Sequence, residues 1–440
     1  MKTINSHFLF IFSQFRLKVN SSWFKGDDGM ESKQVIEGRE EPTSLWKNKN
    51  FLFLWGGSTV QSIGMQMYTL AIPLLIYSMT ESALAMSAMR AIDFFPNIFL
   101  GIIAGVLVDR MNRKRMMRWT SLISIMASLG IIMLLVSNTI QLWHLYILGF
   151  VLSSAGYTFG NAHHSVMPQI VSKEQLTSAN ARLSFVNTFI QTVGPGLAGI
   201  LLGIVTTASV LSIYTMSLII LFICVEFVQV PEKKPRKGEQ ARSWTREMKE
   251  GWRELFQNKT LLTPTITIIF INLAMSLVIG VLVFYAADQL HASEKEIGLM
   301  FSISSLGGLL GALAVKPLRK KFNRGRIFTS FRLVDVIAMV LLIFANTWWL
   351  LGIGLAIRTF STVISNIIYL AIRQEVTPNH MLGRVAGTAS MFMKLTLPFG
   401  LFIAGIWAEW LPVPLLFIFS AAIFLTLFLW LSRHSFRKVA

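Results

Sequence analysis

Two residues of opposite charge, Arg90 and Asp93, lie three positions apart in a stretch that is otherwise mostly apolar. Positions three apart share one face of an α-helix, so each charge can neutralise the other. A charge in the middle of a membrane costs at least about 2.5–3.5 kcal/mol, so such residues usually face a cavity or a partner. Because a carboxyl group shielded from water can gain and lose a proton usefully, Asp93 is the leading candidate for a proton-coupling group. The alternative is a structural ion pair between helices.

Five further charges lie inside other apolar stretches. One of them, Glu226, lies near the end of its stretch and is expected to reach the lipid headgroups. Arg332 and Asp335 repeat the three-residue spacing, and here the structural pair is the preferred interpretation. Arg358 and Lys394 have no acidic partner in their own stretches. Counted together with the first pair, they predict a cavity of net positive charge, which favours an anionic or zwitterionic substrate over a lipophilic cation.

Polar uncharged residues add a second set of candidates. Gln61 and Gln66 lie in the first apolar stretch, where they can offer hydrogen bonds to a cavity. His163 and His164 are adjacent, so on a helix they diverge and cannot hold one metal ion together; packing or capping is preferred to a proton relay. The sequence has no Walker loop, His-Glu-x-x-His motif or serine elbow in a suitable context. We therefore expect no cofactor, no metal and no enzymatic activity.

Helices that cross a membrane must position these residues. A bilayer core about 30 Å thick needs roughly 20 apolar residues at about 1.5 Å per residue. The chain has twelve such stretches, near 51–77, 82–108, 119–136, 142–162, 183–205, 208–228, 261–285, 297–315, 327–344, 347–371, 385–408 and 412–432. The predicted fold class is an all-α integral membrane protein with twelve transmembrane helices.

The composition supports a membrane protein. Of the 440 residues, 53% are hydrophobic and only 14% are charged, whereas about a quarter of the residues of a soluble domain are charged. The single cysteine, Cys224, cannot form a disulfide within the chain. These values exclude a disordered chain, a disulfide scaffold and a soluble enzyme.

Positive charge is distributed asymmetrically along the chain. Nearly all of the 40 Lys and Arg residues lie in the two tails and in the connections that follow the even-numbered stretches. The odd-numbered connections contain a single one, Lys295. Since Lys and Arg are retained on the cytoplasmic side, both termini are expected in the cytoplasm. The net charge of +18 then reflects topology, and no nucleic-acid partner is expected.

The longest internal polar segment divides the apolar stretches six from six. The predicted organisation is a tail over 1–44, a six-helix half over 45–229, a linker over 230–260, a second half over 261–432 and a tail over 433–440. Residues Gln169 and Val171 recur in the second half as Gln374 and Val376. Two six-helix pseudo-repeats with a site between them are typical of transporters.

Two polar segments carry separate expectations. In the linker, Trp244, Met248 and Trp252 fall near one helical face, which predicts an amphipathic helix on the anionic inner leaflet; the alternative is a solvated linker. Residues 1–29 fit neither a signal peptide nor a domain. We hypothesise that Met30 is the true start and that residues 1–29 are not translated.

The segment GVLVDRMNRKR, residues 105–115, follows the second apolar stretch. It resembles the Gly-x-x-x-Asp-Arg-x-Gly-Arg-Lys signature of the major facilitator superfamily. The matching residues are Gly105, Asp109, Arg110, Arg113 and Lys114. Asn112 replaces the second Gly, and we expect it at positive φ, which Asn tolerates. The resemblance implies a conformational gate in which Asp109 pairs with basic loop residues and with a helix N-terminus of the other half. The second half has Val315 at the Asp position, so the gate is predicted to be one-sided.

Further segments resemble the branch of this superfamily that contains enterobactin exporters and macrolide-efflux proteins. They are 45–64, 79–86, 167–184 and 193–199, and the resemblance extends over about 45–432. The last segment holds an exporter motif of the fifth helix, made of Gly194, Pro195, Gly196 and Gly199. Two departures stand out: Met65 follows Gly64 where relatives often have Asp, and 142–162 has no Arg.

The resemblance implies secondary active efflux by alternating access in the cell membrane. The expected substrate is an amphiphilic small molecule, either drug-like or macrolide-like, or an anionic siderophore-like metabolite. The expected coupling ion is the proton, with Na⁺ as the alternative, and the protein is expected to be a monomer in the lipid bilayer. The remaining alternatives are an importer or facilitator of a small nutrient and, least favoured, an integral-membrane enzyme.

Overall fold

The computed structural model describes residues 45–110, 112–230, 244–378 and 381–439. The chain divides into residues 1–43 and 44–440, and the fold below is that of the second part. The hypothesis about Met30 and most of the basic part of the predicted linker, 231–243, lie outside the described residues. Helix positions 98, 99, 101–110, 173, 177, 244–248 and 383 are described for their backbone alone.

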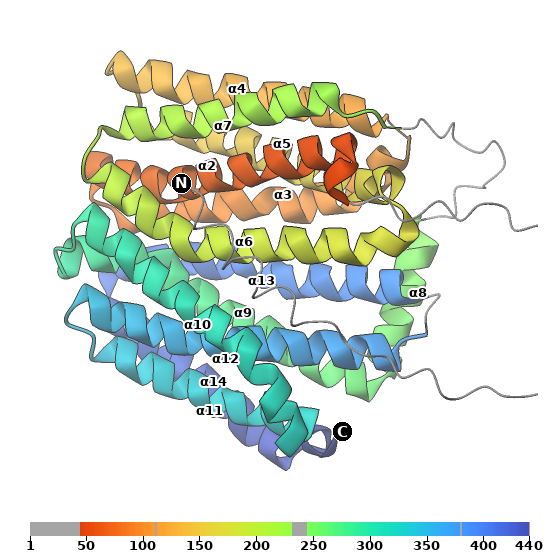
Figure 1. Cartoon of the computed structure of the whole chain (residues 1–440). Coiled ribbons are helices and arrows are strands. Elements are labelled where there is room, and N and C mark those ends of the chain that lie inside the picture. Colours follow the sequence, from red (N-terminus) through yellow and green to blue (C-terminus); the bar gives the residue numbers. More distant parts are fainter. Residues whose placement is uncertain (1–44, 111, 231–243, 379–380, 440) are drawn as a thin grey trace, which may run out of the picture. The chain divides into compact units, whose positions relative to one another are not determined.

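The described residues form helices and connections without a strand. There are thirteen α-helices (Figure 1): α2 Lys49–Thr80, α3 Ala83–Arg110, α4 Arg113–Val136, α5 Leu142–Ile170, α6 Lys173–Leu202, α7 Thr207–Phe227, α8 Trp244–Gln257, α9 Lys259–Phe284, α10 Glu294–Lys321, α11 Arg324–Ile343, α12 Trp348–Val376, α13 Leu382–Trp410 and α14 Val413–Arg433. A short π-helix, Tyr285–Gln289, continues α9. All except α8 coincide with the apolar stretches of the sequence.

Many of these helices are suited to a lipid environment. Nine of them, within the described residues, are long and apolar enough to cross a membrane: α2, α4, α6, α7, α9, α10, α12, α13 and α14. Helix α4 shows why, because Trp119, Met126 and Met133 are exposed and lie seven positions apart. That spacing places three large apolar side chains on one outward face of the helix. Exposing this face to water would cost free energy, whereas contact with lipid would not.

Local side-chain contacts fix where several helices begin. The side chain of Asn48 accepts a hydrogen bond from the backbone N–H of Phe51 at 3.1 Å and thereby caps α2. Asn112 does the same for α4, accepting from the N–H of Arg115 at 2.9 Å with φ −61°. The expectation of positive φ at Asn112 is therefore wrong. Asn is suited to this position because its side chain caps a helix.

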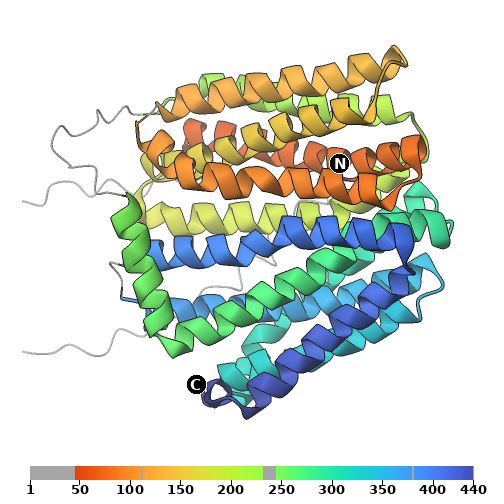
Figure 2. The same ribbon diagram turned by 180° about the vertical axis from the view of Figure 1, so that it is seen from behind.

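The long helices pack as two groups of six, α2–α7 and α9–α14 (Figures 1 and 2). In the first group α2 packs on α6 and α7, α5 on α3 and α4, and α4 on α7. Each of these pairs has a counterpart in the second group: α9 with α13 and α14, α12 with α10 and α11, and α11 with α14. The two groups thus share one packing scheme.

The groups meet through two equivalent helix pairs, α3 with α13 and α6 with α10. We call the end of the bundle that carries the α3–α4 and α10–α11 connections the basic end, and the other the opposite end. At the opposite end Tyr77 donates to Asp288 at 3.2 Å, and Glu409 accepts from the backbone N–H of Leu84 at 3.0 Å. The opposite end is therefore closed by contacts between the groups.

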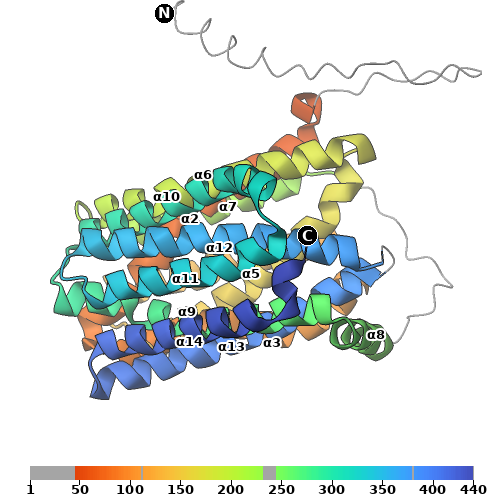
Figure 3. The same cartoon turned by 90° about the horizontal axis from the view of Figure 1, so that it is seen from below.

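Helix α8 lies across the basic end and belongs to the second group (Figure 3). Leu255 is buried, and the ring of Trp252 packs edge-on against Phe392 of α13 with centroids 4.8 Å apart. Arg384 of α13 forms an ion pair with Glu250. A helix therefore forms in the predicted linker, and its apolar face contacts α13.

Candidate functional site

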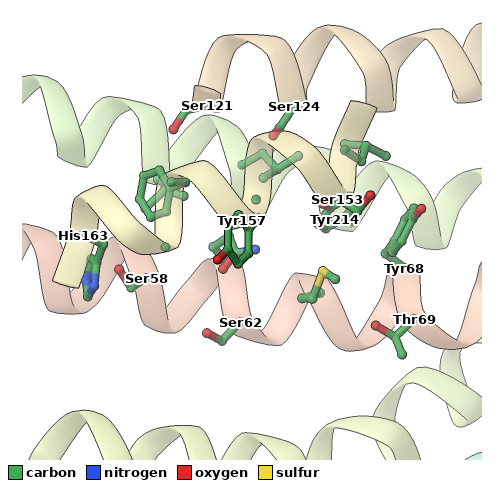
Figure 4. A pocket seen from close by; sticks show the side chains of 18 of the residues that line it. Ser58, Ser62, Tyr68, Thr69, Ser121, Ser124, Ser153, Tyr157, His163 and Tyr214 are labelled. Atoms are coloured by element: carbon green, nitrogen blue, oxygen red, sulfur yellow. The ribbon is translucent and has the colours of Figure 1, made fainter. Parts of the chain in front are cut away.

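The first helix group contains a cavity of about 530 Å³. All six of its helices, α2 to α7, contribute to the lining. Figure 4 shows the side chains that point into it, with His163 and Ser58 toward one end and Tyr68 and Thr69 toward the other. The lining is rich in hydroxyl groups: Ser58, Thr59, Ser62, Tyr68, Thr69, Ser121, Ser124, Ser153, Tyr157 and Tyr214.

The charged pair of the sequence analysis lines this cavity. The guanidinium of Arg90 donates to the backbone carbonyl of Thr69 at 2.8 Å. Asp93 interacts electrostatically with Arg90, but its Oδ1 atom is buried without a hydrogen-bond partner among the described residues. The structure thus brings both residues to one cavity. Arg90 is hydrogen-bonded to the backbone of α2, whereas one oxygen of Asp93 can still accept a hydrogen bond.

Two tyrosines flank the carboxyl group of Asp93. Tyr68 of α2 and Tyr214 of α7 have ring centroids 5.2 Å apart, and both interact electrostatically with Asp93. Their side chains are only 3% and 4% exposed. The hydroxyl of Tyr68 has no hydrogen-bond partner in the described residues. The two rings thus place apolar surface near Asp93, and their hydroxyl groups are available for polar contacts inside the cavity.

The part of the cavity nearer the basic end has a different composition. His163 is 8% exposed and stacks on Phe159 with ring centroids 6.1 Å apart. Its Nε2 atom has no hydrogen-bond partner among the residues that the structure describes. The hydroxyls of Ser58 and Ser121 are likewise buried and unpartnered within the described part of the chain. His164 also lines the cavity but is exposed. Both histidines therefore lie at the candidate site.

Several lining residues were not found from the sequence. Ser121 and Ser124 lie three positions apart in the apolar helix α4, and Tyr214 lies in α7. The signal available was the spacing of the two serines, which places them on one helix face. Nothing in the sequence indicates that this face turns toward α5 rather than toward lipid.

The predicted glutamines divide between two environments. Gln61 lines the cavity together with Met65. Gln66 lies outside it, against Gly194 of α6, where a Cβ at Gly194 would meet the Cβ of Gln66 at 3.1 Å. One of the two predicted polar side chains thus reaches the cavity.

Arg358 does not reach this cavity, because it belongs to a buried cluster in the second group. Asp335 of α11 forms an ion pair with Arg332 at 2.9 Å and another with Arg358 of α12 at 3.4 Å. Arg332 also donates to Ser365, and Arg358 to Thr362. The guanidinium of Arg358 lies 5.1 Å from the ring centroid of Phe424. All three charged side chains of this buried triad are almost completely buried.

Lys394 also lies outside the cavity, as an exposed residue of α13. Of the four charges that predicted a positive cavity, the structure gathers only Arg90 and Asp93. The cavity therefore carries one charge of each sign, and the expectation of a net positive charge is corrected for this site. The reason is that Arg358 faces Asp335 on a neighbouring helix, which spacing within one helix cannot reveal.

The predicted gate lies at the basic end. Gly105, Asp109 and Arg110 form the last turns of α3, where the backbone alone is described. Arg113 and Lys114 begin α4, and Lys114 donates to the backbone carbonyl of Glu226 at 2.7 Å. The side chain of Glu226, expected to reach the headgroups, forms an ion pair with Arg118 at 2.9 Å.

The exporter motif of the fifth helix lies in α6, which continues through Pro195. Gly196 packs near Ser302 of α10. A Cβ at Gly199 would meet the Cα atom of Gly298 at 2.7 Å, a distance that side chains do not adopt. Glycine is therefore required where α6 and α10 touch. No group of three or more potential metal ligands occurs among the described residues.

Comparisons with known proteins agree with this architecture. The family model described as a transmembrane secretion effector matches residues 41–439. The chain is 25% identical to Macrolide efflux protein A of Streptococcus pyogenes over 392 residues, which cover 87% of this chain and 95% of that protein. It is 24% identical to the Multidrug efflux pump Tap of Mycolicibacterium fortuitum, over 81% of this chain and 90% of that pump.

A solved structure shows the same fold. A bacterial homologue of the iron transporter ferroportin, in an inward-facing state, superposes with a TM-score of 0.67 at 18% identity, covering 89% of this chain and 100% of that one. Membership of a transporter family indicates that this protein is not an enzyme. The chain belongs to the transmembrane secretion effector family, in the macrolide and drug efflux branch of the major facilitator superfamily.

Proposed function

We propose that this protein is a secondary active efflux transporter that moves an amphiphilic small molecule out of the cell in exchange for protons. The observation that carries the proposal is the cavity of the first helix group, in which a buried oxygen of Asp93 has no hydrogen-bond partner among the described residues. A carboxyl group in such a setting can bind a proton without breaking an ion pair. The efflux activities named for the relatives support the direction of transport.

The proposed topology has twelve membrane spans in two pseudo-repeats. Helices α3, α5 and α11 are the spans added to the nine that satisfy length and apolarity. The support is that α3 and α5 pack on each other and on α2, with α5 also on α4, while α11 packs on α12 and α14. The asymmetry of Lys and Arg supports a cytoplasmic basic end, with both termini in the cytoplasm. The contacts at the opposite end then correspond to an inward-facing state of a monomer in the cell membrane.

We assign roles to the remaining candidates on the same basis. Arg90 is hydrogen-bonded to the backbone of α2 and so holds α3 beside α2. Its positive charge also partly offsets the negative charge of Asp93. The gate segment, Gly105 to Lys114, regulates closure of the basic end, and the exporter motif in α6 supports close approach to α10. Since the cavity balances one positive and one negative charge, the favoured substrate is neutral or zwitterionic and amphiphilic.

Transport in proteoliposomes tests the proposal, with the macrolide erythromycin as the probe. Vesicles with an acidic lumen, in which the basic end of the protein faces the medium, should accumulate the macrolide, because protons leave the lumen as the macrolide enters. Asp93→Asn should abolish this accumulation and leave exchange of macrolide across the membrane without a gradient intact. Glu81→Gln, which changes an exposed carboxylate at the opposite end, is the control and should behave as wild type.

Two outcomes would contradict the proposal. If accumulation depends on a Na⁺ gradient and not on the pH gradient, the coupling ion is Na⁺ and not the proton. Full pH-driven accumulation by Asp93→Asn would remove Asp93 from the coupling step. A panel of zwitterionic and anionic amphiphiles in the same vesicles would then define the substrate class.

A further inference from the structure

The cavity of the first group collects buried polar atoms that have no hydrogen-bond partner in the described part of the protein. These atoms are Ser58 Oγ, Tyr68 Oη, Asp93 Oδ1, Ser121 Oγ and His163 Nε2. A buried polar group without a partner costs about 1–3 kcal/mol. Because the five atoms come from α2, α3, α4 and α5 and line one hollow, they require a common partner inside it.

Water is the partner that the geometry fits. One water molecule needs only about 10–15 Å³ of cavity and two to four polar neighbours, and this cavity measures about 530 Å³. Hydroxyl groups from α2, α4, α5 and α7 are distributed along it (Figure 4). A cavity stays dry when its lining is apolar, which does not apply here.

The cavity connects two depths of the membrane. At about 1.5 Å per helical residue, Asp93 lies roughly 25 Å from the basic end of α3, and His163 roughly 10 Å from the basic end of α5. The two levels are thus about 15 Å apart, which hydrogen-bonded waters spaced at about 2.8 Å cover in five or six steps. Tyr157 and Ser62 lie between the two ends in Figure 4.

We propose that this cavity holds a chain of water molecules that carries protons between Asp93 and the basic end, and that His163 is a positioning residue of that route. The inference rests on the proposed proton coupling. Each water accepts one proton and gives up another, and the Nε2 atom of His163 orders the chain, so that neither water nor imidazole is consumed. The route runs inside one helix group, between α2, α4, α5 and α7, rather than between the two groups.

The ionisable groups around Asp93 are consistent with a route in this direction. Arg90 faces it from its own helix, Tyr68 from α2 and Tyr214 from α7, while α5 contributes Tyr157 and the two histidines. The lining from α4 and α6 is uncharged. Beyond Arg90, no permanently charged side chain of the described lining stands between Asp93 and His163.

Hydroxyl-radical footprinting of the purified full-length protein tests the water chain without any substrate. Radicals generated from bound water by X-rays should modify Tyr68 and Tyr214, although these side chains are 3% and 4% exposed. Tyr285 and Tyr369 of the second group, both 6% exposed, are matched controls. We expect labelling of the first pair to be about tenfold faster, since water lies beside them. Equal labelling of the two pairs would overturn the water chain, whatever the transporter carries.

Transport by His163 variants tests the proton route. His163→Phe preserves an aromatic ring on Phe159 but removes the nitrogen, and should slow pH-driven macrolide accumulation about tenfold while gradient-free exchange stays within about twofold of wild type. His163→Gln, which retains a hydrogen-bonding side chain, should recover most of the rate. Glu81→Gln, at the opposite end and outside the cavity lining, is the control and should match wild type. Exchange by each variant reports that it is folded.

The two hypotheses fail in distinguishable ways. Unchanged pH-driven accumulation by His163→Phe overturns the proton route, even where Asp93→Asn confirms the coupling residue. If His163→Phe slows accumulation and exchange equally, His163 serves substrate movement, and the route is overturned as well. Full coupling in Asp93→Asn contradicts the proposed function, whereas the footprinting contrast between the tyrosine pairs is independent of that result.

Discussion

The two helix groups share a packing scheme but treat buried charge in opposite ways. In the second group Asp335 satisfies two arginines at once, and the buried triad is bonded to Ser365 and Thr362. In the first group one oxygen of Asp93 has no hydrogen-bond partner in the part of the chain that the structure describes, and it lies beside a cavity of about 530 Å³. An interior in which a carboxylate pairs with two arginines links neighbouring helices, whereas one with a cavity beside the carboxylate has room for a ligand or a proton. The same packing scheme thus contains a paired half and a hollow half.

The largest expected effect comes from breaking the buried triad. Asp335→Asn leaves Arg332 and Arg358 without a counter-charge, and a broken buried ion pair destabilises a protein by about 3–5 kcal/mol. Thermal unfolding of the detergent-purified protein, followed by light scattering, measures the loss. A variant that unfolds at the wild-type temperature would contradict the structural role of the triad.

A smaller effect is expected where the two groups touch. Gly199→Val places a side chain against Gly298, where even a Cβ is too close to the backbone, and overpacking costs about 1–3 kcal/mol. The groups should separate at the opposite end. Spin labels at Thr139→Cys and Leu411→Cys, in a Cys224→Ser background, should report a longer distance. An unchanged distance would show that α6 and α10 accommodate the side chain within the same state.

Loss of the Glu409 charge should weaken the opposite end still less. Glu409 accepts from Ser82 Oγ at 2.5 Å and from the N–H of Leu84 at the start of α3. Glu409→Gln keeps an acceptor but removes a charge at a helix N-terminus, worth about 0.3–1 kcal/mol. Hydrogen exchange at the first turn of α3 should accelerate by about two- to fivefold. Glu81→Gln serves as the control, and equal rates in all three proteins would exclude Glu409 as a closing contact.

The smallest stability effect is expected at Asp93. Asp93→Asn removes the negative charge beside Arg90, but Arg90 keeps its hydrogen bond to the backbone carbonyl of Thr69 and its place in the cavity lining, so the free energy of unfolding should change by less than about 1 kcal/mol. Thermal unfolding alongside Asp335→Asn is the direct comparison. Equal destabilisation by the two substitutions would abolish the distinction between a paired and a hollow half.

The helices were largely predictable from the sequence. A bilayer fixes the length of an apolar stretch, so the stretches near 119–136 and 412–432 coincide with α4 and α14. The pairing of Arg332 with Asp335 follows from their spacing on one helix and is observed. These features depend on neighbours within about four residues, which a sequence shows directly.

The cavity and its charge were not predictable in the same way. Arg358 finds Asp335 on the adjacent helix, and Ser121 meets the cavity only because α4 packs on α5. Both depend on the rotation of one helix against another, which is set by the packing of many side chains. Asn112 is a local example, because Asn is suited both to a left-handed turn and to a helix N-cap. The sequence does not distinguish the two, and the structure shows the N-cap of α4.

Helix α8 has a mechanical consequence. Because Leu255, Trp252 and the ion pair of Glu250 with Arg384 attach it to α13, it moves as part of the second group. The covalent tether between the groups is then the chain from Val228 to residue 243. A single proteolytic cut within it would leave two fragments held together only by the packing of α3 on α13 and of α6 on α10, and α8 would remain with the second fragment.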